Sequence, residues 1–170
     1  MRIAIGADSA GANLKNLIKS RLEERDDLAI TDFGVPDAET PTAYPQIGLE
    51  VARTVAAGEA ERGLLICGTG IGMAITANKV PGIRATVAHD SFSVERSVLS
   101  NDCQVLTLGA RVIGPELAMR LVDEWLTYEF DDTSASAGKV ALIDDYEATR
   151  TRQKRVPSSA VAPWSRLKDE

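Results

Sequence analysis

A strand, a glycine-rich loop and a helix follow one another without a break between residues 63 and 79. The short apolar run from Gly63 to Ile66 is typical of a buried strand in a parallel sheet. The segment Cys67–Met73 reads CGTGIGM, and the residues after it keep a helical spacing until a stop at Pro81. Since open α/β sheets bind ligands at the carboxyl ends of their strands, Cys67 is expected to lie at a ligand-binding edge.

The same order of strand and helix recurs along the chain. Strands are predicted at residues 2–7, 28–33, 63–66, 83–88 and 104–109, and helices at 14–22, 44–57, 74–79, 91–99, 115–125 and 139–153. This pattern predicts an α/β fold with a Rossmann-like, doubly wound, five-stranded parallel sheet. Residues 1–149 are expected to form a single domain that ends in a C-terminal helix. Residues 150–170, with mixed charge and two prolines, are expected to be an extension that is partly disordered or docked on a partner subunit.

Composition excludes several classes of function. A chain of 170 residues can bury one core, and its net charge of −6 argues against a surface for nucleic acid or for an anionic membrane. Two cysteines and one histidine, without metal-type spacing, predict no metal and no cofactor. The chain starts directly with a strand and shows no signal peptide or membrane-spanning run, so we expect a cytoplasmic protein.

Cys67 allows two interpretations. A cysteine after an apolar strand is often a small buried hydrophobe. Here, however, it precedes glycine amides and a helix N-terminus, which stabilise a thiolate. Such a thiolate can take a proton from a carbon beside a carbonyl, and loop N–H groups can hold the resulting enediolate. Each such donor is worth about 2.7–4 kcal/mol, and a placed base adds on the order of 10²–10⁴ in rate.

Four further residues stand at the same predicted edge. Asp8 follows the first strand and either caps the next helix or binds substrate hydroxyls, and we favour the second role. Ser9 is expected to cap that helix. Tyr44, at a helix start, either lines the pocket or packs. The lone His89 is expected to be structural.

Several separated motifs, in order, resemble the ribose-5-phosphate isomerase B family over residues 2–147. These motifs are Asp8 in GADxAG, Tyr44-Pro45, CGTGIGM at 67–73, ANKxPGIRA at 77–85, Asn101, and GxRVIG at 109–114. The resemblance implies a Rossmann-like sheet, no metal, and a dimer, or a tetramer of dimers, with its site at the subunit interface.

The resemblance also implies roles for individual residues. Cys67 is the base, and Thr69 forms an anion hole with the amides of Gly68, Gly70 and Gly72. Asp8, Tyr44 and Asn101 match substrate-contacting positions. Arg111 matches a phosphate-side position that is reached from the partner subunit.

Departures from the family pattern bear on the substrate. Ser9 and Ser100 stand where the family usually carries a phosphate-binding and a ring-opening histidine, and Ala135 and Lys139 replace two phosphate-binding arginines. A tetrose 4-phosphate is open-chain, because closure onto its remaining hydroxyls would give strained three- or four-membered rings. The combination is similar to the branch that interconverts D-erythrulose 4-phosphate and D-erythrose 4-phosphate. A rebuilt phosphate site would then use Lys139, Ser9, Ser136 and loop amides, with Ser100 at a substrate-binding position.

Three other functions are alternatives to this tetrose-phosphate isomerase. A ribose 5-phosphate or allose 6-phosphate isomerase would need another ring-opening group, for which His89 is the candidate. A non-catalytic sugar-phosphate-binding subunit would not need Cys67. A thiol redox protein is disfavoured because Cys103 lies at the start of a strand, at the other edge of the sheet.

Overall fold

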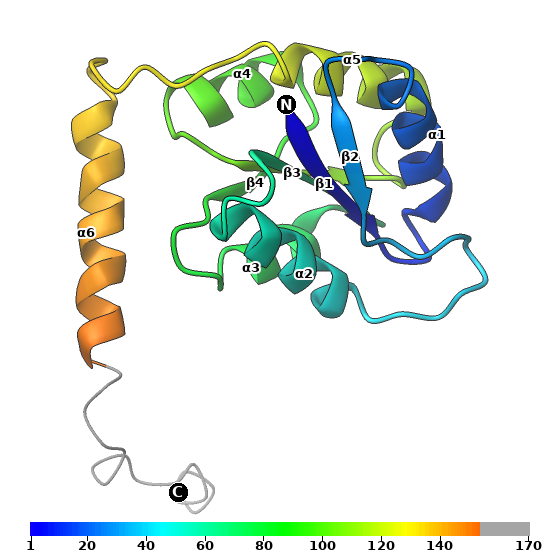
Figure 1. Ribbon diagram of the computed structural model, residues 1–170, viewed down its shortest axis with the longest axis horizontal. Helices are drawn as coiled ribbons and strands as arrows, with labels where there is room; N and C mark the ends of the chain where they lie inside the picture. Colours follow the sequence, from blue (N-terminus) through cyan, green and yellow to red (C-terminus); the bar gives the residue numbers. More distant parts are fainter. Residues whose placement is uncertain (154–170) are drawn as a thin grey trace, which may run out of the picture.

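The predicted five-stranded parallel sheet is confirmed (Figure 1). The structure is a computed structural model, and it describes residues 1–153. The strands are β1 Arg2–Ala7, β2 Ala29–Asp32, β3 Arg62–Cys67, β4 Ala85–Val87 and β5 Val105–Gly109. The helices are α1 Ala12–Leu22, α2 Tyr44–Ala56, α3 Ile71–Ala77, α4 Ser91–Leu99, α5 Pro115–Trp125 and α6 Ala137–Gln153. In the sheet the strands stand in the order β2-β1-β3-β5-β4, so the carboxyl ends of β1, β3 and β5 are neighbours.

Helices cover both faces of the sheet, as a doubly wound topology requires. One core joins α1, α4 and α5 to one face and includes Ile66 and the fully buried Trp125. The other core joins α2 and α3 to the opposite face and includes Leu65 and Met73. Residues 64–67 of β3 alternate between these cores, which explains why this part of the strand is apolar without a break.

A buried lysine fixes the loop that leads towards Tyr44. The side chain of Lys15 on α1 is 1% exposed, and its Nζ donates to Asp32 Oδ2 at 2.7 Å and to the carbonyl of Val35 at 3.1 Å. The amide of Val35 donates to the carbonyl of Ala7 at 3.0 Å. The chain after β2 is therefore held against the end of β1, immediately before Asp8.

Some element bounds differ from those predicted. β4 is shorter because Arg84 donates its amide to the side chain of Gln104, at 2.9 Å, instead of to a neighbouring strand. α6 begins at Ala137, two residues before the predicted start, and ends at Gln153, as predicted. The predicted domain boundary after residue 149 therefore falls inside this helix. The remainder of the predicted extension, residues 154–170, lies outside the described residues.

α6 stands beside the body of the domain rather than over a face of the sheet (Figure 1). Val140 is buried, whereas Leu142, Ile143 and Tyr146 are 70%, 52% and 66% exposed. This helix therefore presents an apolar surface outside the two cores. No helix within residues 1–153 combines the length and the apolar character that a membrane span requires.

Candidate active site

Cys67 is the last residue of β3 and lies at the carboxyl edge of the sheet. It pairs in register with Gly109 of β5 and is 6% exposed. The amide of Gly70 donates a hydrogen bond to its Sγ at 3.1 Å. The sulfur therefore lies within reach of a backbone donor of the glycine loop, at the edge where a ligand is expected.

The loop after Cys67 is held in one shape by its neighbours. Gly70 has φ +81°, a conformation that favours glycine, and its carbonyl accepts from the buried Thr107 hydroxyl at 2.9 Å. The Cys67 carbonyl accepts from the Ala110 amide at 2.8 Å. Since the first amides of a helix have no acceptor inside it, the N–H of Gly72 at the start of α3 can serve a substrate oxygen.

Thr69 belongs to this loop, and Tyr44, the first residue of α2, packs against it. Thr69 is exposed and accepts a hydrogen bond from the amide of Ile71 at 3.4 Å. Its backbone packs so closely on Gly109 that a Cβ there would lie 2.7 Å from Thr69 Cα. A Cβ on Gly72 would lie 2.6 Å from the ring of Tyr44, which is 41% exposed. Tyr44 therefore packs on the loop and still has part of its surface in solvent, and its role in lining a pocket stays a prediction.

Asp8 lies at the same edge, one residue beyond the pair of Ala7 with Ile66. Its Oδ1 accepts from the amide of Gly11 at 3.1 Å, and Ser9 is half-buried beside it. The expectation that Ser9 caps α1 was wrong. The helix begins at Ala12, and its N-cap residue is Gly11, which has no side chain to cap it. The amide of Gly11 donates to Asp8 instead of to Ser9. Asp8 thus has a structural contact through one carboxylate oxygen and a second oxygen for other partners.

Arg111 also belongs to this edge in its own chain, and its expected place in a site shared with a partner subunit stays a prediction. A Cβ on Gly68 would lie 3.5 Å from Arg111 Cδ, and the Arg111 amide donates to the Gly68 carbonyl at 3.0 Å. The reason is the parallel pairing of β3 with β5, which brings the residues after both strands together. Arg111 therefore adds a cation next to the loop of its own chain.

His89 has the structural contact that we expected. Its Nε2 accepts from the amide of Gly109 at 2.9 Å. Burial lowers the pKa of His89, and the nearby Asp90 carboxylate offsets this only in part. The imidazole is therefore neutral at pH 7, and the nitrogen nearest the loop is already used.

Ser100, Asn101 and Lys139 are not brought to Cys67 within one chain. Ser100 ends α4, and its Oγ lies 3.4 Å from Arg96 Nη1. Asn101 donates through Nδ2 to the carbonyl of Arg96 at 2.9 Å. This turn lies at the amino edge of the sheet, roughly the length of β5 away from Cys67, or about 15–20 Å. Lys139 is exposed in the first turn of α6.

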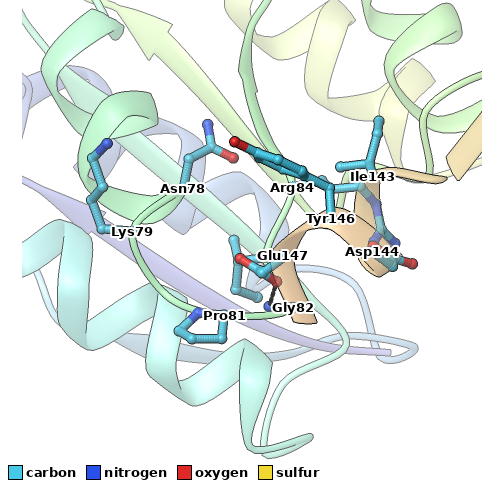
Figure 2. A pocket seen from close by; sticks show the side chains of 10 residues that line it. Asn78, Lys79, Pro81, Gly82, Arg84, Ile143, Asp144, Tyr146 and Glu147 are labelled. Carbon is cyan, nitrogen blue, oxygen red and sulfur yellow. Dashed lines mark hydrogen bonds and ion pairs between the residues drawn. The ribbon is translucent and has the colours of Figure 1, made fainter. Parts of the chain in front are cut away.

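Two cavities lie on the side of this second group. One of about 540 Å³ is lined by Arg84, Arg96 and Asn101 among others. The other, of about 370 Å³, lies between α6 and residues 78–84, where Figure 2 shows Glu147 beside the Gly82 amide. Sequence reasoning missed Arg84 as a member of this region. Its signal was a charged residue between two apolar ones, Ile83 and Ala85, at the start of a predicted strand.

No group of three or more His, Cys, Asp and Glu side chains that could hold a metal ion occurs among the described residues. The carboxyl edge brings together a thiol, backbone donors, one carboxylate and one guanidinium.

Comparison with known proteins identifies the family. The model of the Ribose/Galactose Isomerase family matches residues 3–143. D-erythrulose-4-phosphate isomerase 2 of Mycolicibacterium smegmatis is 55% identical over 148 residues, which cover 86% of this chain and 97% of the relative. Ribose-5-P isomerase B of Listeria innocua is 48% identical over 147 residues, or 86% of this chain and 97% of the relative.

A solved structure supports the same assignment. Ribose-5-phosphate isomerase B of Clostridium thermocellum superposes with a TM-score of 0.83 at 44% identity, over 88% of this chain and 99% of that one. The resemblance that the motifs indicated is thus confirmed along almost the whole described domain. The chain belongs to the ribose/galactose isomerase family and is an isomerase.

Proposed function

We propose that the protein interconverts D-erythrulose 4-phosphate and D-erythrose 4-phosphate. The observation that carries the proposal is the Cys67 thiol, which receives the Gly70 N–H at the carboxyl edge of the sheet. Identity of 55% to a D-erythrulose-4-phosphate isomerase supports the choice of substrate. So do Ser9 and Ser100, where the family usually carries histidines.

In the ketose-to-aldose direction, Cys67 thiolate removes a proton from C1, and the electron pair forms the C1=C2 double bond of a cis-enediolate. The negative charge moves to the former carbonyl oxygen at C2, where the amide of Gly72 and the hydroxyl of Thr69 hold it. The thiol then returns the proton to C2, while Asp8 or a water moves the hydroxyl proton from O1 to O2. No redox partner is needed, because the substrate is oxidised at C1 and reduced at C2.

The proposed substrate explains the absence of a ring-opening group. Pentose and hexose phosphates must first open a cyclic hemiacetal, which requires an acid or base near the ring oxygen. Ser100 lacks a titratable group for this step, and His89 already accepts the Gly109 amide. A tetrose 4-phosphate starts as the open chain and bypasses the step.

We also propose that the complete site forms between two chains. Ser100, Asn101 and Lys139 lie too far from Cys67 to reach the same small sugar within one chain. A two-fold dimer can place this group of one protomer over the loop of the other, and symmetry then gives two equivalent sites. The exposed apolar residues of α6 provide a surface for the pairing. A tetramer of dimers is compatible with the same arrangement.

The phosphate is assigned to the cations of the two groups. Arg111 lies beside Gly68 on the catalytic loop. Lys139 comes from the partner, with the N-terminal turn of α6, whose amides attract anions. Ser9 and Ser136 complete the rebuilt phosphate site. These contacts replace the family's arginine pair at a shorter distance from the base.

The first test compares the two cysteines. Cys67→Ala should lower kcat on D-erythrulose 4-phosphate by on the order of 10²–10⁴, because the proton-transferring base is lost. Cys103→Ala is the matched control, since it removes a buried thiol at the amino edge and should keep near-normal turnover. Aldose formation by purified proteins is the measurement, and near-normal turnover by Cys67→Ala would end the proposal.

The second candidate function is ribose 5-phosphate isomerisation, which the 48% identity to a ribose-5-P isomerase B favours. Rates on D-erythrose 4-phosphate, ribose 5-phosphate and allose 6-phosphate, measured side by side, separate the candidates, because only the five- and six-carbon aldoses form rings. A higher kcat/KM on the four-carbon substrate supports the first. Preference for the pentose would show that another group opens the ring.

A further inference from the structure

Arg84 connects three segments that are far apart in the sequence. Its side chain is only 14% exposed at the start of β4. Its Nε donates to the carbonyls of Asn101 at 3.1 Å and Asp102 at 3.0 Å, and one Nη pairs with the Asp102 carboxylate. The other Nη donates to Asp144 of α6 at 2.7 Å. A single guanidinium therefore joins β4, the turn after α4, and α6.

The turn that Arg84 holds is backbone-strained. Asp102 has φ +47°, and it is the one non-glycine residue of the described chain in the left-handed region. Such conformations persist where surrounding contacts enforce them, and they gather at functional sites. Here two backbone bonds at the end of α4, from the Asp102 amide to Val98 and from the Cys103 amide to Ser97, both at 2.9 Å, act together with the bonds to Arg84. The residue just before Asp102 is Asn101, a predicted substrate contact.

The pair with Asp144 extends this control to α6. Lys139 lies on the same helix, little more than one turn before Asp144. The Gly82 amide, two residues before Arg84, also donates a hydrogen bond to Glu147 of α6 at 2.6 Å (Figure 2). Arg84 therefore helps to fix the distance between Asn101 and Lys139.

We propose that Arg84 is a positioning residue, which fixes Asn101 and Lys139 relative to each other so that both meet the substrate on the partner's loop. This inference rests on the proposed function, because it assumes that these two residues contact the substrate. Arg84 itself faces Asp102 and Asp144 and does not act on the reacting carbons.

The test is a double-mutant cycle between Arg84 and Asn101. Arg84→Met keeps the length and apolar stem of the side chain but removes every donor, and it should lower kcat/KM by about 10²-fold through misplacement. Asn101→Ala should then cost much less in the Arg84→Met background than in the wild type, because Asn101 is already displaced. Arg120→Met is the matched control, since it removes an exposed arginine on α5 that pairs only with Glu124 of its own helix.

Two readouts decide the outcome. Strong non-additivity in kcat/KM, with faster amide hydrogen exchange at residues 100–104 in Arg84→Met but not in Arg120→Met, supports the proposal. Additive losses, or unchanged exchange at those residues, would overturn it, because a purely stabilising arginine lowers the folded fraction equally in both backgrounds.

A second variant covers the case in which Arg84→Met does not fold. Asp102→Asn keeps a residue that tolerates the left-handed conformation while it removes the charge that pairs with Arg84. It should show the same direction of both effects, to a smaller extent. A wild-type protein inactive on every sugar phosphate would overturn the proposed function instead, and the exchange comparison would still decide whether Arg84 holds the turn.

Discussion

Position in the sheet decides what each of the two thiols can do. Cys67 ends β3 and receives the Gly70 amide. Cys103 precedes β5 at the amino edge, where burial raises the pKa of its thiol to about 11 despite the nearby Arg84. Cys103 is therefore protonated and inert at neutral pH, whereas Cys67 is placed for proton transfer.

His89 gives a second prediction at the level of the residue. Loss of a general acid typically lowers the rate by on the order of 10²–10⁴-fold. His89→Gln should lose far less activity than this on the four-carbon substrate, because the glutamine Oε1 can still accept a hydrogen bond from the Gly109 amide. The measurement is kcat/KM for the wild type and variant on both D-erythrulose 4-phosphate and ribose 5-phosphate. A loss confined to ribose 5-phosphate would identify His89 as a ring opener.

At the level of the elements, the ion pair between Lys15 of α1 and Asp32 at the end of β2 contributes to stability in a pH-dependent way. Burial alone would raise the pKa of Asp32, but hydrogen bonds from Lys15, the Gly34 amide and Lys19 outweigh it and hold this pKa below its ordinary value of 3.8. A lowered folded pKa means that the stabilisation is complete above about pH 4 and is lost as pH falls through the folded pKa.

Lys15→Met should therefore lower the free energy of unfolding by about 2 kcal/mol at pH 7, since Asp32 loses its buried cation and the Val35 carbonyl loses its side-chain donor, while Lys19 and the Gly34 amide still reach Asp32. Urea unfolding at pH 7 and below pH 4 is the measurement, and the difference from the wild type should shrink in acid. Arg25→Met, which removes an exposed pair with Asp27, should cost less than about 1 kcal/mol at either pH. A loss independent of pH would contradict the role given to Asp32.

Most elements could be predicted from the sequence because their signals are local. The bounds of β1, α4 and α5 agree with the predicted ones, since apolar spacing and a proline or serine at the start are enough to define them. The carboxyl-edge location of Cys67 followed from the order of strand and helix. The environments of Arg84 and Arg111 could not be predicted, because they depend on pairings between segments that are distant in sequence, such as β3 with β5.

At the level of the whole molecule, the proposed division of the site between two chains predicts complementation. When Cys67→Ala and Asn101→Ala chains are co-assembled in equal amounts, half of the dimers are mixed. Each mixed dimer has one site with both changes and one site with neither. Activity should therefore return to about a quarter of the wild-type value, although each variant alone is nearly inactive.

The measurement is the specific activity of co-expressed chains, together with the mass in solution by light scattering. A monomer with full activity would contradict the shared site. Activity that equals the mean of the two parent variants would show that Cys67 and Asn101 serve the same site within one chain.

The distance between Cys67 and Asn101 along the sheet has an evolutionary consequence. In the proposed two-chain site, proton abstraction depends on one surface of the chain and the fit to the sugar depends partly on another, so mutations can alter the two independently. Substitutions around Ser100 and Lys139 can shorten or lengthen the accepted carbon chain while the thiol and its loop stay intact. A single ancestral scaffold can thereby supply catalysts for several sugars without passing through an inactive form.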